Sequence, residues 1–302
     1  MSDLIFRGTA PALVTPFTVD NTIDEEAFRQ LIDYQIENGV DGVVVLGTTG
    51  ENPTITPPER RQLVTGAVEH VDGRVPVIVG TGTNNTKQSI RLSEEAARLG
   101  ADALLVVGPY YNKPSQEGFR AHVEAIAEAA GIPIILYNVP GRTSFNIEPQ
   151  TVRQLAQSLP EVRGIKEASG DLTQVADILA HRPDDFAVYA GDDEMAWPII
   201  ALGGEGVVSV VSNALPEAFS TMVRDALAGN VESARTRHFD LLPAMRACFY
   251  ETNPVPIKTV CAALGLMEER VRRPLVPLSR RSSTRQHVLN IFDEWTAVST
   301  QG

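Results

Sequence analysis

Lys166 and Tyr137 are the two residues whose types and spacing could carry covalent chemistry. Each directly follows a short apolar run, at residues 162–165 and 132–136, and the two lie 29 positions apart. That distance matches one strand-plus-helix unit of roughly 30 residues, so both side chains could emerge at the same end of a parallel sheet. A lysine amine can form a Schiff base with a carbonyl substrate, and a phenol beside it can move the protons. The pair therefore predicts Schiff-base chemistry on a carbonyl compound.

A lysine is a nucleophile only when it is uncharged, and this sets conditions on the surroundings of Lys166. Removal from water inside a barrel and a nearby guanidinium would both disfavour the ammonium form. Glu167 does not cancel this effect, because adjacent residues of a strand point to opposite faces. If Lys166 enters the barrel, we expect Glu167 to face the surrounding helices.

Eight short runs rich in valine, isoleucine and leucine are the elements that would position this pair. They lie at residues 10–14, 40–46, 75–79, 103–107, 132–136, 162–165, 186–190 and 206–211. Segments of helical period separate them, such as 25–38 and 60–71, and the second carries a capping signature at Thr56 and Glu59. Repeated strand-then-helix order with apolar strands predicts a (β/α)8 TIM barrel. A doubly wound open sheet is the second choice, since no Gly-x-Gly-x-x-Gly motif opens a first strand-helix turn.

The last quarter of the chain shows helical patterns without strands. From about residue 231 onward no strand signal remains, and helices are predicted at 234–250, 254–264 and 284–295. No linker separates this segment from the barrel. We therefore divide the chain into a catalytic barrel at 1–230 and a C-terminal helical extension at 231–302 that packs on it.

The composition is that of a soluble globular protein. The 302 residues are 43% hydrophobic and carry a formal net charge of −12, which opposes nonspecific binding to nucleic acid or to an anionic membrane. No run of about 18 apolar residues occurs and no leader pattern follows Met1, so we expect a cytoplasmic protein. Cys248 and Cys261 lack the close spacing of a metal or redox pair, so we expect them to be buried.

The loops that follow the predicted strands add further candidates. Barrel enzymes carry their active sites at the C-terminal ends of the strands. Each loop alone has a plainer reading, as a tight turn, a packed tyrosine or an arginine paired with a surface carboxylate. Together they would place hydroxyls, phenols and one arginine at the same barrel mouth as Lys166. These loops are Gly47-Thr48-Thr49-Gly50-Glu51, Gly108-Pro109-Tyr110-Tyr111-Asn112-Lys113-Pro114, Tyr137-Asn138-Val139-Pro140-Gly141-Arg142-Thr143 and Gly191-Asp192-Asp193.

Other chemistries find less support in the sequence. A metal site or a serine hydrolase would need a histidine near a strand end, but all five histidines fall in predicted helices or helix ends. We expect Asp192 and Asp193 to begin the following helix rather than to bind a metal. A phosphate could sit at residues 80–86, on a helix N-terminus. Barrels usually bind phosphate after strands seven and eight, where this chain has no Gly-rich basic loop.

Taken together, the motifs resemble the dihydrodipicolinate synthase and N-acetylneuraminate lyase family of Schiff-base-forming barrel enzymes, from the first strand to the C-terminal helices. Two features favour the dihydrodipicolinate synthase branch over the sialic acid lyases. They are Gly141-Arg142-Thr143 after the tyrosine and Glu251-Thr252-Asn253-Pro254-Val255-Pro256-Ile257-Lys258 at a C-terminal helix. The resemblance implies condensation of pyruvate with L-aspartate 4-semialdehyde, in lysine and diaminopimelate biosynthesis, with no cofactor.

The resemblance also implies catalytic roles for four residues. Lys166 would form the imine with pyruvate, and Tyr137 would shuttle protons as the enamine forms and attacks the aldehyde. Thr48 and Tyr111 would complete the proton relay. In the family this last tyrosine reaches across from a neighbouring subunit, so Tyr111 implies at least a dimer, and commonly a tetramer built as a dimer of dimers.

Four further positions match the substrate pocket of the family. Arg142 would hold the carboxylate of the semialdehyde. Thr49 would donate a hydrogen bond to the carboxylate of pyruvate, and Val208 would contribute a backbone contact. Gly191 matches a pocket position as well.

The chain departs from the resembled family at the site where some members bind the inhibitor lysine. The histidines and the glutamate of that site are replaced by Pro57, Arg60 and Gln88, whereas Asn84 and Tyr110 are retained. A cationic ligand would lose the glutamate and meet a guanidinium. We therefore predict weak or absent inhibition by lysine, which an inhibition constant in the low micromolar range would refute.

Two other functions stay open at this point. A pyruvate-dependent aldolase acting on a sugar acid would keep Lys166 and Tyr137 but would not turn over aspartate semialdehyde. A non-catalytic binding protein derived from such an enzyme would not trap pyruvate at all.

Overall fold

Eight parallel strands form a barrel in the computed structural model, which describes residues 4–299. The hydrogen-bonded order is β1-β8-β7-β6-β5-β4-β3-β2, so each strand neighbours the next one along the chain and β1 also pairs with β8. A parallel bridge between Ala12 and Val44 joins β1 to β2 and closes the ring. The strands are β1 (Gly8–Pro11), β2 (Val43–Val45), β3 (Val77–Gly80), β4 (Ala103–Val107), β5 (Ile134–Asn138), β6 (Val162–Glu167), β7 (Ala187–Ala190) and β8 (Gly206–Ser209).

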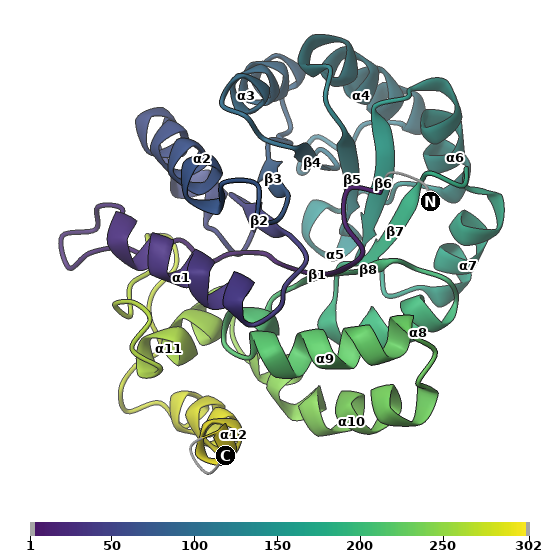
Figure 1. The fold of residues 1–302 in the computed structure, drawn as a ribbon. Coiled ribbons are helices and arrows are strands. Elements are labelled where there is room, and N and C mark those ends of the chain that lie inside the picture. Colours follow the sequence, from purple (N-terminus) through teal and green to yellow (C-terminus); the bar gives the residue numbers. More distant parts are fainter. Residues whose placement is uncertain (1–3, 300–302) are drawn as a thin grey trace.

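Helices surround the barrel in the alternating order that the sequence predicts (Figure 1). Short 3-10 helices lie at Asn52–Thr54, Asp193–Met195 and Val211–Asn213. The barrel helices are α1 (Glu25–Glu37), α2 (Pro57–Val71), α3 (Thr86–Arg98), α4 (Gln116–Ala130), α5 (Pro140–Thr143), α6 (Pro149–Ser158), α7 (Leu172–His181), α8 (Ala196–Ala201) and α9 (Pro216–Leu227). The predicted (β/α)8 barrel is thus confirmed.

Two apolar layers hold this arrangement together. One fills the barrel interior, where alternate strand residues such as Ile78, Leu105 and Tyr189 meet. The other lies between the strands and the helices and contains the opposite set, such as Val79 and Leu104. Strands buried on both faces explain the nearly continuous apolar runs in the sequence.

Three helices follow the barrel: α10 (Val231–Ala247), α11 (Val255–Ala263) and α12 (Ser283–Ser299). α10 packs on α9, and α12 packs on α10 and α11, so the helical extension is confirmed. The division predicted at 231 falls where α10 begins, and its outer limits at residues 1 and 302 lie outside the described residues. Cys248 and Cys261 are both buried and free, as predicted.

The strand ends differ from the prediction where it matters for the chemistry. β5 and β6 were expected to stop at residues 136 and 165, but the ladder between them continues two residues further. Tyr137 and Lys166 therefore belong to the strands themselves. A polar residue inside a strand carries no apolar signal, which is why the periodicity ended too early.

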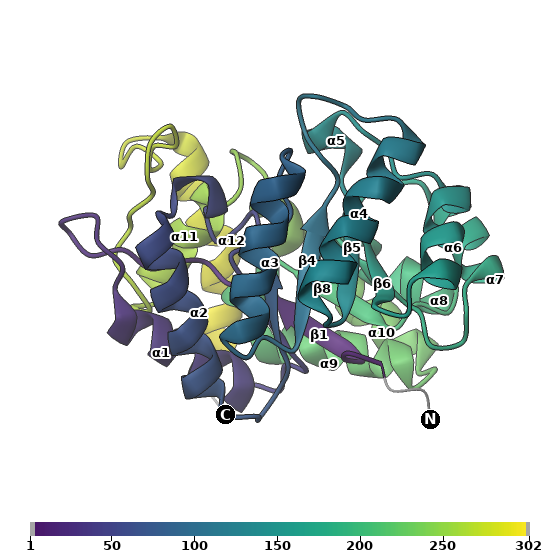
Figure 2. The ribbon, with the colours of Figure 1, turned by 90° about the horizontal axis from the view of Figure 1, so that it is seen from above.

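The C-terminal ends of the strands form one end of the barrel. In Figure 2 the short helix α5, which follows β5, stands at the top of the molecule, on the opposite side from the N-terminus. No helix within residues 4–299 is long and apolar enough to cross a membrane.

Candidate active site at the barrel mouth

The strand register makes Tyr137 and Lys166 direct neighbours. They are paired residues of β5 and β6, and the Nζ atom of Lys166 lies 4.3 Å from the centroid of the Tyr137 ring. Both side chains are buried, with about one twentieth of their surface exposed. Tyr137 belongs to the apolar cluster that fills the barrel interior. The structure thus brings together the amine and the phenol whose spacing suggested the chemistry.

Glu167 points away from this pair, as the alternation of strand residues predicts. Its carboxylate accepts hydrogen bonds from Asn138 Nδ2 at 3.1 Å, from Gln174 Nε2 of α7 at 3.1 Å and from the backbone N–H of Ser169 at 2.7 Å. These bonds lie in the layer between the sheet and the helices. Glu167 therefore fixes the end of β6 from outside the barrel and leaves Lys166 on the inside.

Gly191 leaves the space that the Lys166 side chain needs. A Cβ atom at this position would lie 3.1 Å from Lys166 Cε and 2.6 Å from Ala168 Cβ. The backbone N–H of Gly191 donates to Glu167 O at 2.7 Å, which joins the ends of β6 and β7. A larger residue would displace the amine, so the predicted pocket role of Gly191 has a steric basis.

Asp192 adds a charge beside the amine that the sequence did not single out. Burial raises the pKa of this carboxyl, the nearby Glu194 raises it further, and the positive charge of Lys166 lowers it. Asp192 is therefore a largely buried carboxyl whose titration responds to the charge of Lys166.

Asp193 begins the following helix as predicted, and its side chain also makes long-range contacts. It begins the short helix Asp193–Met195, as expected, but its carboxylate accepts from the backbone N–H groups of Val210 and Val211 at 3.1 and 2.8 Å. Full burial raises its pKa to about 6. The side chain therefore ties the β7 loop to the end of β8 instead of capping its own helix. Nothing in the sequence indicated these contacts, because the partners lie 17 and 18 residues away.

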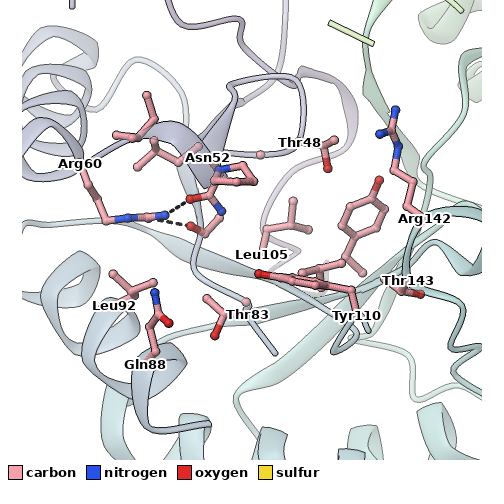
Figure 3. Close-up of a pocket in the computed structure, with 18 of the residues that line it drawn as sticks. Thr48, Asn52, Arg60, Thr83, Gln88, Leu92, Leu105, Tyr110, Arg142 and Thr143 are labelled. Atoms are coloured by element: carbon pink, nitrogen blue, oxygen red, sulfur yellow. Dashed lines mark hydrogen bonds between the residues drawn. The ribbon is translucent and has the colours of Figure 1, made fainter. Parts of the chain in front are cut away.

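A cavity of about 450 Å³ opens at the ends of β2 to β5, and we call it the mouth cavity (Figure 3). Thr48, Tyr110, Tyr137 and Arg142 line it, together with Thr143 and the apolar side chains Leu105 and Val107. Lys166 does not line this cavity but adjoins it through Tyr137. No aspartate or glutamate of the described chain is among the lining residues, whereas Arg60, Arg91 and Arg142 are. The cavity is therefore suited to an anionic ligand.

Arg142 keeps its guanidinium available. It lies in α5, directly after β5, and its side chain is exposed at the rim of the mouth cavity. Within residues 4–299 it forms no ion pair or hydrogen bond that would occupy it. No surface carboxylate of residues 4–299 pairs with Arg142 in this structure.

Thr49 and Val208 lie deeper in the barrel mouth. Thr49 is 2% exposed, and its Oγ1 accepts from Asn253 Nδ2 at 3.0 Å. Val208 is fully buried in β8 and belongs to the same interior cluster as Tyr137. Thr48 faces the cavity instead, so the two adjacent threonines serve different parts of the mouth.

Tyr111 is the predicted site residue that the chain does not bring to the others. Its side chain is 89% exposed, and its backbone adopts a φ of +74°, which is uncommon for a tyrosine. Tyr110, the preceding residue, lines the mouth cavity instead. Within one chain, Tyr111 therefore lies apart from the other residues predicted for the proton relay.

The three replaced positions of the lysine site line the far end of the same cavity. Pro57, Arg60 and Gln88 lie there with Tyr110, whereas Asn84 accepts a hydrogen bond from Asn112 through its backbone oxygen at 2.8 Å. Arg60 is buried and donates to Gly80 O at 2.8 Å and to Asn52 Oδ1. Burial lowers its pKa to about 10, which leaves it charged at neutral pH.

The structure offers little to a metal ion. All five histidines lie in helices, as predicted, and within the described part of the chain no three His, Cys, Asp or Glu side chains form a group that could hold a metal. The N-terminus of α3, considered for phosphate, is capped by Asn85, whose side chain accepts from Gln88 N at 3.2 Å.

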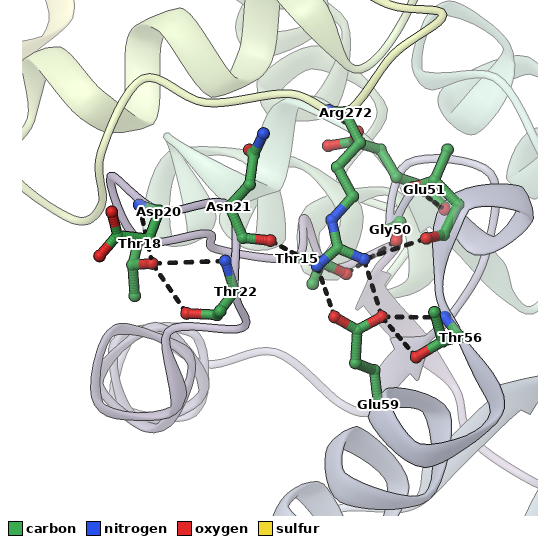
Figure 4. A network of polar contacts seen from close by, with 11 residues as sticks. Thr15, Thr18, Asp20, Asn21, Thr22, Gly50, Glu51, Thr56, Glu59 and Arg272 are labelled. Carbon is green, nitrogen blue, oxygen red and sulfur yellow. Dashed lines mark hydrogen bonds and ion pairs between the residues drawn. The ribbon is translucent and has the colours of Figure 1, made fainter.

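The loop that follows β2, at residues 46–51, is called the β2 loop here. Residues of the C-terminal extension hold it in place (Figure 4). Glu51 and Lys258 form an ion pair at 2.6 Å, both 1% exposed, and Lys258 also donates to Thr15 O at 2.7 Å. The backbone N–H of Arg272 donates to Glu51, and its guanidinium pairs with Glu59. Burial lowers the pKa of Lys258 to about 8 although Glu51 opposes the shift. The predicted capping box also holds, since Glu59 accepts from Thr56 N at 2.9 Å.

Sequence reasoning missed Asp192 as a charge partner and Asn253 as a contact of Thr49. Asn253 stood in a motif that selected the family branch, but nothing in the sequence assigned it a role. The contact joins positions 204 residues apart, so only the folded chain reveals it.

Comparisons with known proteins agree with this geometry. The model of the dihydrodipicolinate synthetase family matches residues 5–291. A 4-hydroxy-tetrahydrodipicolinate synthase from Salinibacter ruber is 66% identical over 292 residues, which cover 97% of each chain. Among solved structures, a dihydrodipicolinate synthase from Thermotoga maritima is 43% identical with a TM-score of 0.93, over 96% of this chain and 98% of that one.

A second solved structure comes from Cyanidioschyzon merolae and is described as having lysine bound. It is 38% identical with a TM-score of 0.93 and covers 96% of this chain and 98% of that one. The family match spans nearly the whole chain, and the identities extend over the barrel and the extension alike. The chain therefore belongs to the dihydrodipicolinate synthetase family.

Proposed function

We propose that this member of the dihydrodipicolinate synthetase family condenses pyruvate with L-aspartate 4-semialdehyde to 4-hydroxy-tetrahydrodipicolinate, in lysine and diaminopimelate biosynthesis. The observation that carries the proposal is the neighbouring pair of Lys166 and Tyr137, buried side by side at the end of the barrel that opens into the mouth cavity. The relative with 66% identity bears the name of this activity.

The first half of the reaction activates pyruvate. The amine of Lys166 attacks the carbonyl carbon of pyruvate, and loss of one water leaves an imine. A proton then leaves the methyl carbon, and the electrons of that C–H bond move toward the imine nitrogen, which gives an enamine. The enamine carbon is now a nucleophile.

The second half forms the carbon–carbon bond. The enamine carbon attacks the aldehyde carbon of the semialdehyde, whose oxygen takes up a proton and becomes a hydroxyl. The amino group of the same substrate then attacks the imine carbon, which closes the ring and releases Lys166. One water is lost in total, and the hydroxyl remains at position 4 of the product.

Tyr137 is the residue best placed to move these protons, since its ring lies against the reacting amine. We assign Thr48, at the cavity wall, and Tyr111, from a second subunit, to the same relay. A chain of hydroxyls allows protons to enter and leave without bulk water reaching the enamine.

We assign the carboxylates of the two substrates to separate groups. Arg142, free at the rim, would bind the carboxylate of the semialdehyde. Thr49 would donate to the carboxylate of pyruvate, Val208 would contribute a backbone contact, and Gly191 leaves room beside the imine. A cavity lined by arginines and by no acidic residue of the described chain suits two anionic substrates.

The proposal requires neither a metal nor a bound cofactor, because the covalent imine itself stores the electrons for the bond-forming step. It includes a homo-oligomer of at least two subunits, with a tetramer of two dimers as the expected form, because Tyr111 must come from a neighbour. It also assigns catalysis to the barrel at 1–230, supported by the extension at 231–302, in the cytoplasm.

The test is the consumption of pyruvate by the purified protein, with and without L-aspartate 4-semialdehyde. The proposal predicts consumption only when the semialdehyde is present. If the protein consumes pyruvate with a sugar aldehyde and not with the semialdehyde, the reaction is that of a different aldolase. If no aldehyde supports turnover and pyruvate does not bind, the chain is a non-catalytic protein.

A further inference from the structure

Asn253, just before α11, and Lys258, within α11, both contact the β2 loop. Asn253 Nδ2 donates to Thr49 Oγ1 at 3.0 Å, and five residues later Lys258 pairs with Glu51 at 2.6 Å. All four side chains are at most 5% exposed. Two contacts of this kind fix both the position and the rotation of the loop, so Thr49 is held by the C-terminal extension.

The direction of the first contact decides what the Thr49 hydroxyl can do. A hydroxyl has one proton to donate and two lone pairs to accept with. Because Asn253 donates to Thr49 Oγ1, it occupies a lone pair and leaves the proton of Thr49 free for another acceptor. If an oxygen stood in the place of Nδ2, it would take that proton for itself.

The other end of the Asn253 amide gives a second observation. Its Oδ1 is buried and has no hydrogen-bond partner within the described chain. A buried carbonyl oxygen without a partner is unfavourable, because it has lost its hydrogen bonds to water. An apolar side chain at this position would avoid that penalty, so packing alone does not account for an asparagine here. The hydrogen bond to Thr49 Oγ1 accounts for the asparagine.

We propose that Asn253 is a positioning residue for the keto acid: by donating to Thr49, it makes the Thr49 hydroxyl a hydrogen-bond donor toward the carboxylate of pyruvate. This inference rests on the proposed function, because it takes the ligand of Thr49 to be that carboxylate. The C-terminal extension is then a part of the active site, and Lys258 and Glu51 keep its asparagine in reach.

The test is the binding of pyruvate in the absence of the aldehyde, read as the pyruvate concentration that gives half-maximal trapping by borohydride. For Asn253→Ala we expect this concentration to rise about tenfold, because the Thr49 hydroxyl loses its orientation. For Asn253→Asp, which has nearly the same shape, we expect a rise of about a hundredfold. Its carboxylate would accept the Thr49 proton and repel the substrate. A merely structural asparagine predicts the reverse order, with a smaller rise for Asn253→Asp than for Asn253→Ala.

A double-mutant cycle separates action through Thr49 from independent effects. Thr49→Val should raise the half-saturating pyruvate concentration as well, and adding Asn253→Ala to it should change nothing more. Thr252→Ala is the matched control, since Thr252 is the exposed neighbour in the same segment. Thermal unfolding of each variant checks that the chain is folded, and the Asn253→Asp variant keeps the test decisive if Asn253→Ala does not fold.

Three results would overturn the inference. Unchanged half-saturation in both Asn253 variants would do so, and so would additive effects of Thr49→Val and Asn253→Ala. If the wild-type protein traps no pyruvate at all, the proposed function fails and the inference falls with it. If the wild-type protein traps pyruvate and the variants match it, the inference alone fails.

Discussion

The two sides of the barrel mouth are built in different ways. On the β2 side, the loop with Thr49 and Glu51 is buried and bonded to Asn253, Lys258 and Arg272 of the extension. On the β4 side, Tyr111 projects from the surface with 89% of its side chain exposed. The described chain thus completes one side of its site from its own C-terminus and leaves the other side open.

The side chains on the two sides are therefore positioned by different kinds of contact. The β2 side can hold its hydroxyls in place in a single chain, because long-range contacts fix the loop. The β4 loop has a contact from Asn112 Nδ2 to Asn84 O at 2.8 Å but nothing that directs Tyr111 toward Lys166. A second subunit would supply that direction. Binding of pyruvate should therefore depend on the extension, and proton transfer on assembly.

The largest expected effect on kcat comes from removing the amine of Lys166. Lys166→Ala should lower kcat by more than about a thousandfold, because the covalent route is lost. Steady-state assays of the condensation measure this change. Lys87→Ala, which removes an exposed lysine of α3, is the control and should leave kcat unchanged. Residual activity above a tenth of wild type would contradict the assignment.

The buried ion pair should dominate the stability of the β2 side. Lys258→Met leaves the Glu51 carboxylate buried without its cation, so the free energy of unfolding should fall by about 3 kcal/mol in urea titrations. The double change with Glu51→Gln should recover part of this loss. Arg237→Met breaks an ion pair with Asp225 that is partly exposed and should change stability by less than about 1 kcal/mol. If Lys258→Met and Arg237→Met lowered the free energy of unfolding equally, the expected difference between the two ion pairs would be contradicted.

The exposed tyrosine should matter for rate and not for stability. Tyr111→Phe should lower kcat by about tenfold to a hundredfold through loss of a relay hydroxyl, with an unchanged Tm because the side chain is exposed. Tyr250→Phe, at another exposed tyrosine, should alter neither quantity.

Mixing an inactive form with an impaired one shows whether Tyr111 acts in the neighbouring subunit. Lys166→Ala chains supply an intact Tyr111, and Tyr111→Phe chains supply an intact Lys166. If the tyrosine crosses between subunits, mixed oligomers should regain activity that neither form has alone. Absence of any recovery in confirmed mixed oligomers would place Tyr111 outside the relay.

His122 should make the β4 side sensitive to acid. It lies in α4, its Nδ1 is 2.9 Å from Thr86 Oγ1, and burial lowers its pKa to about 4. Between this value and the unfolded value of about 6.5 the unfolded chain binds more protons, so stability should fall as pH decreases through this range. The loss should reach about 2 kcal/mol, and His122→Asn should flatten the pH dependence in urea titrations. If the free energy of unfolding of the wild-type protein and of His122→Asn changed with pH in the same way, this prediction would be contradicted.

The smallest expected effect concerns lysine at the far end of the mouth cavity. Arg60 remains charged there and Gln88 offers no carboxylate, so a cationic ligand finds no counter-ion among these residues. Millimolar lysine should leave the rate nearly unchanged. The protein from Cyanidioschyzon merolae whose structure has lysine bound is a natural comparison in the same rate measurement.

The sequence predicted the elements of this fold better than their ends. Apolar runs revealed eight strands, and the spacing of 29 residues anticipated that Tyr137 and Lys166 would be neighbours. The ends of β5 and β6 were placed two residues too early, because polar residues continue the ladder there. The contacts of Asn253, Lys258 and Asp193 could not be predicted, since each joins loops that only the closed barrel brings together. Tyr111 is exposed in one chain, so its proposed place in the site would require a second chain.

The central claim is that Lys166 forms the imine with pyruvate, and a peptide map of the reduced adduct tests it most directly. The protein is treated with pyruvate and borohydride, digested and analysed by mass spectrometry. The chain has four lysines, so Lys87, Lys113 and Lys258 serve as internal controls. The account predicts one reduced pyruvate on the peptide that contains Lys166 and none on the other three. An adduct on a different lysine, or no adduct at all, would contradict it.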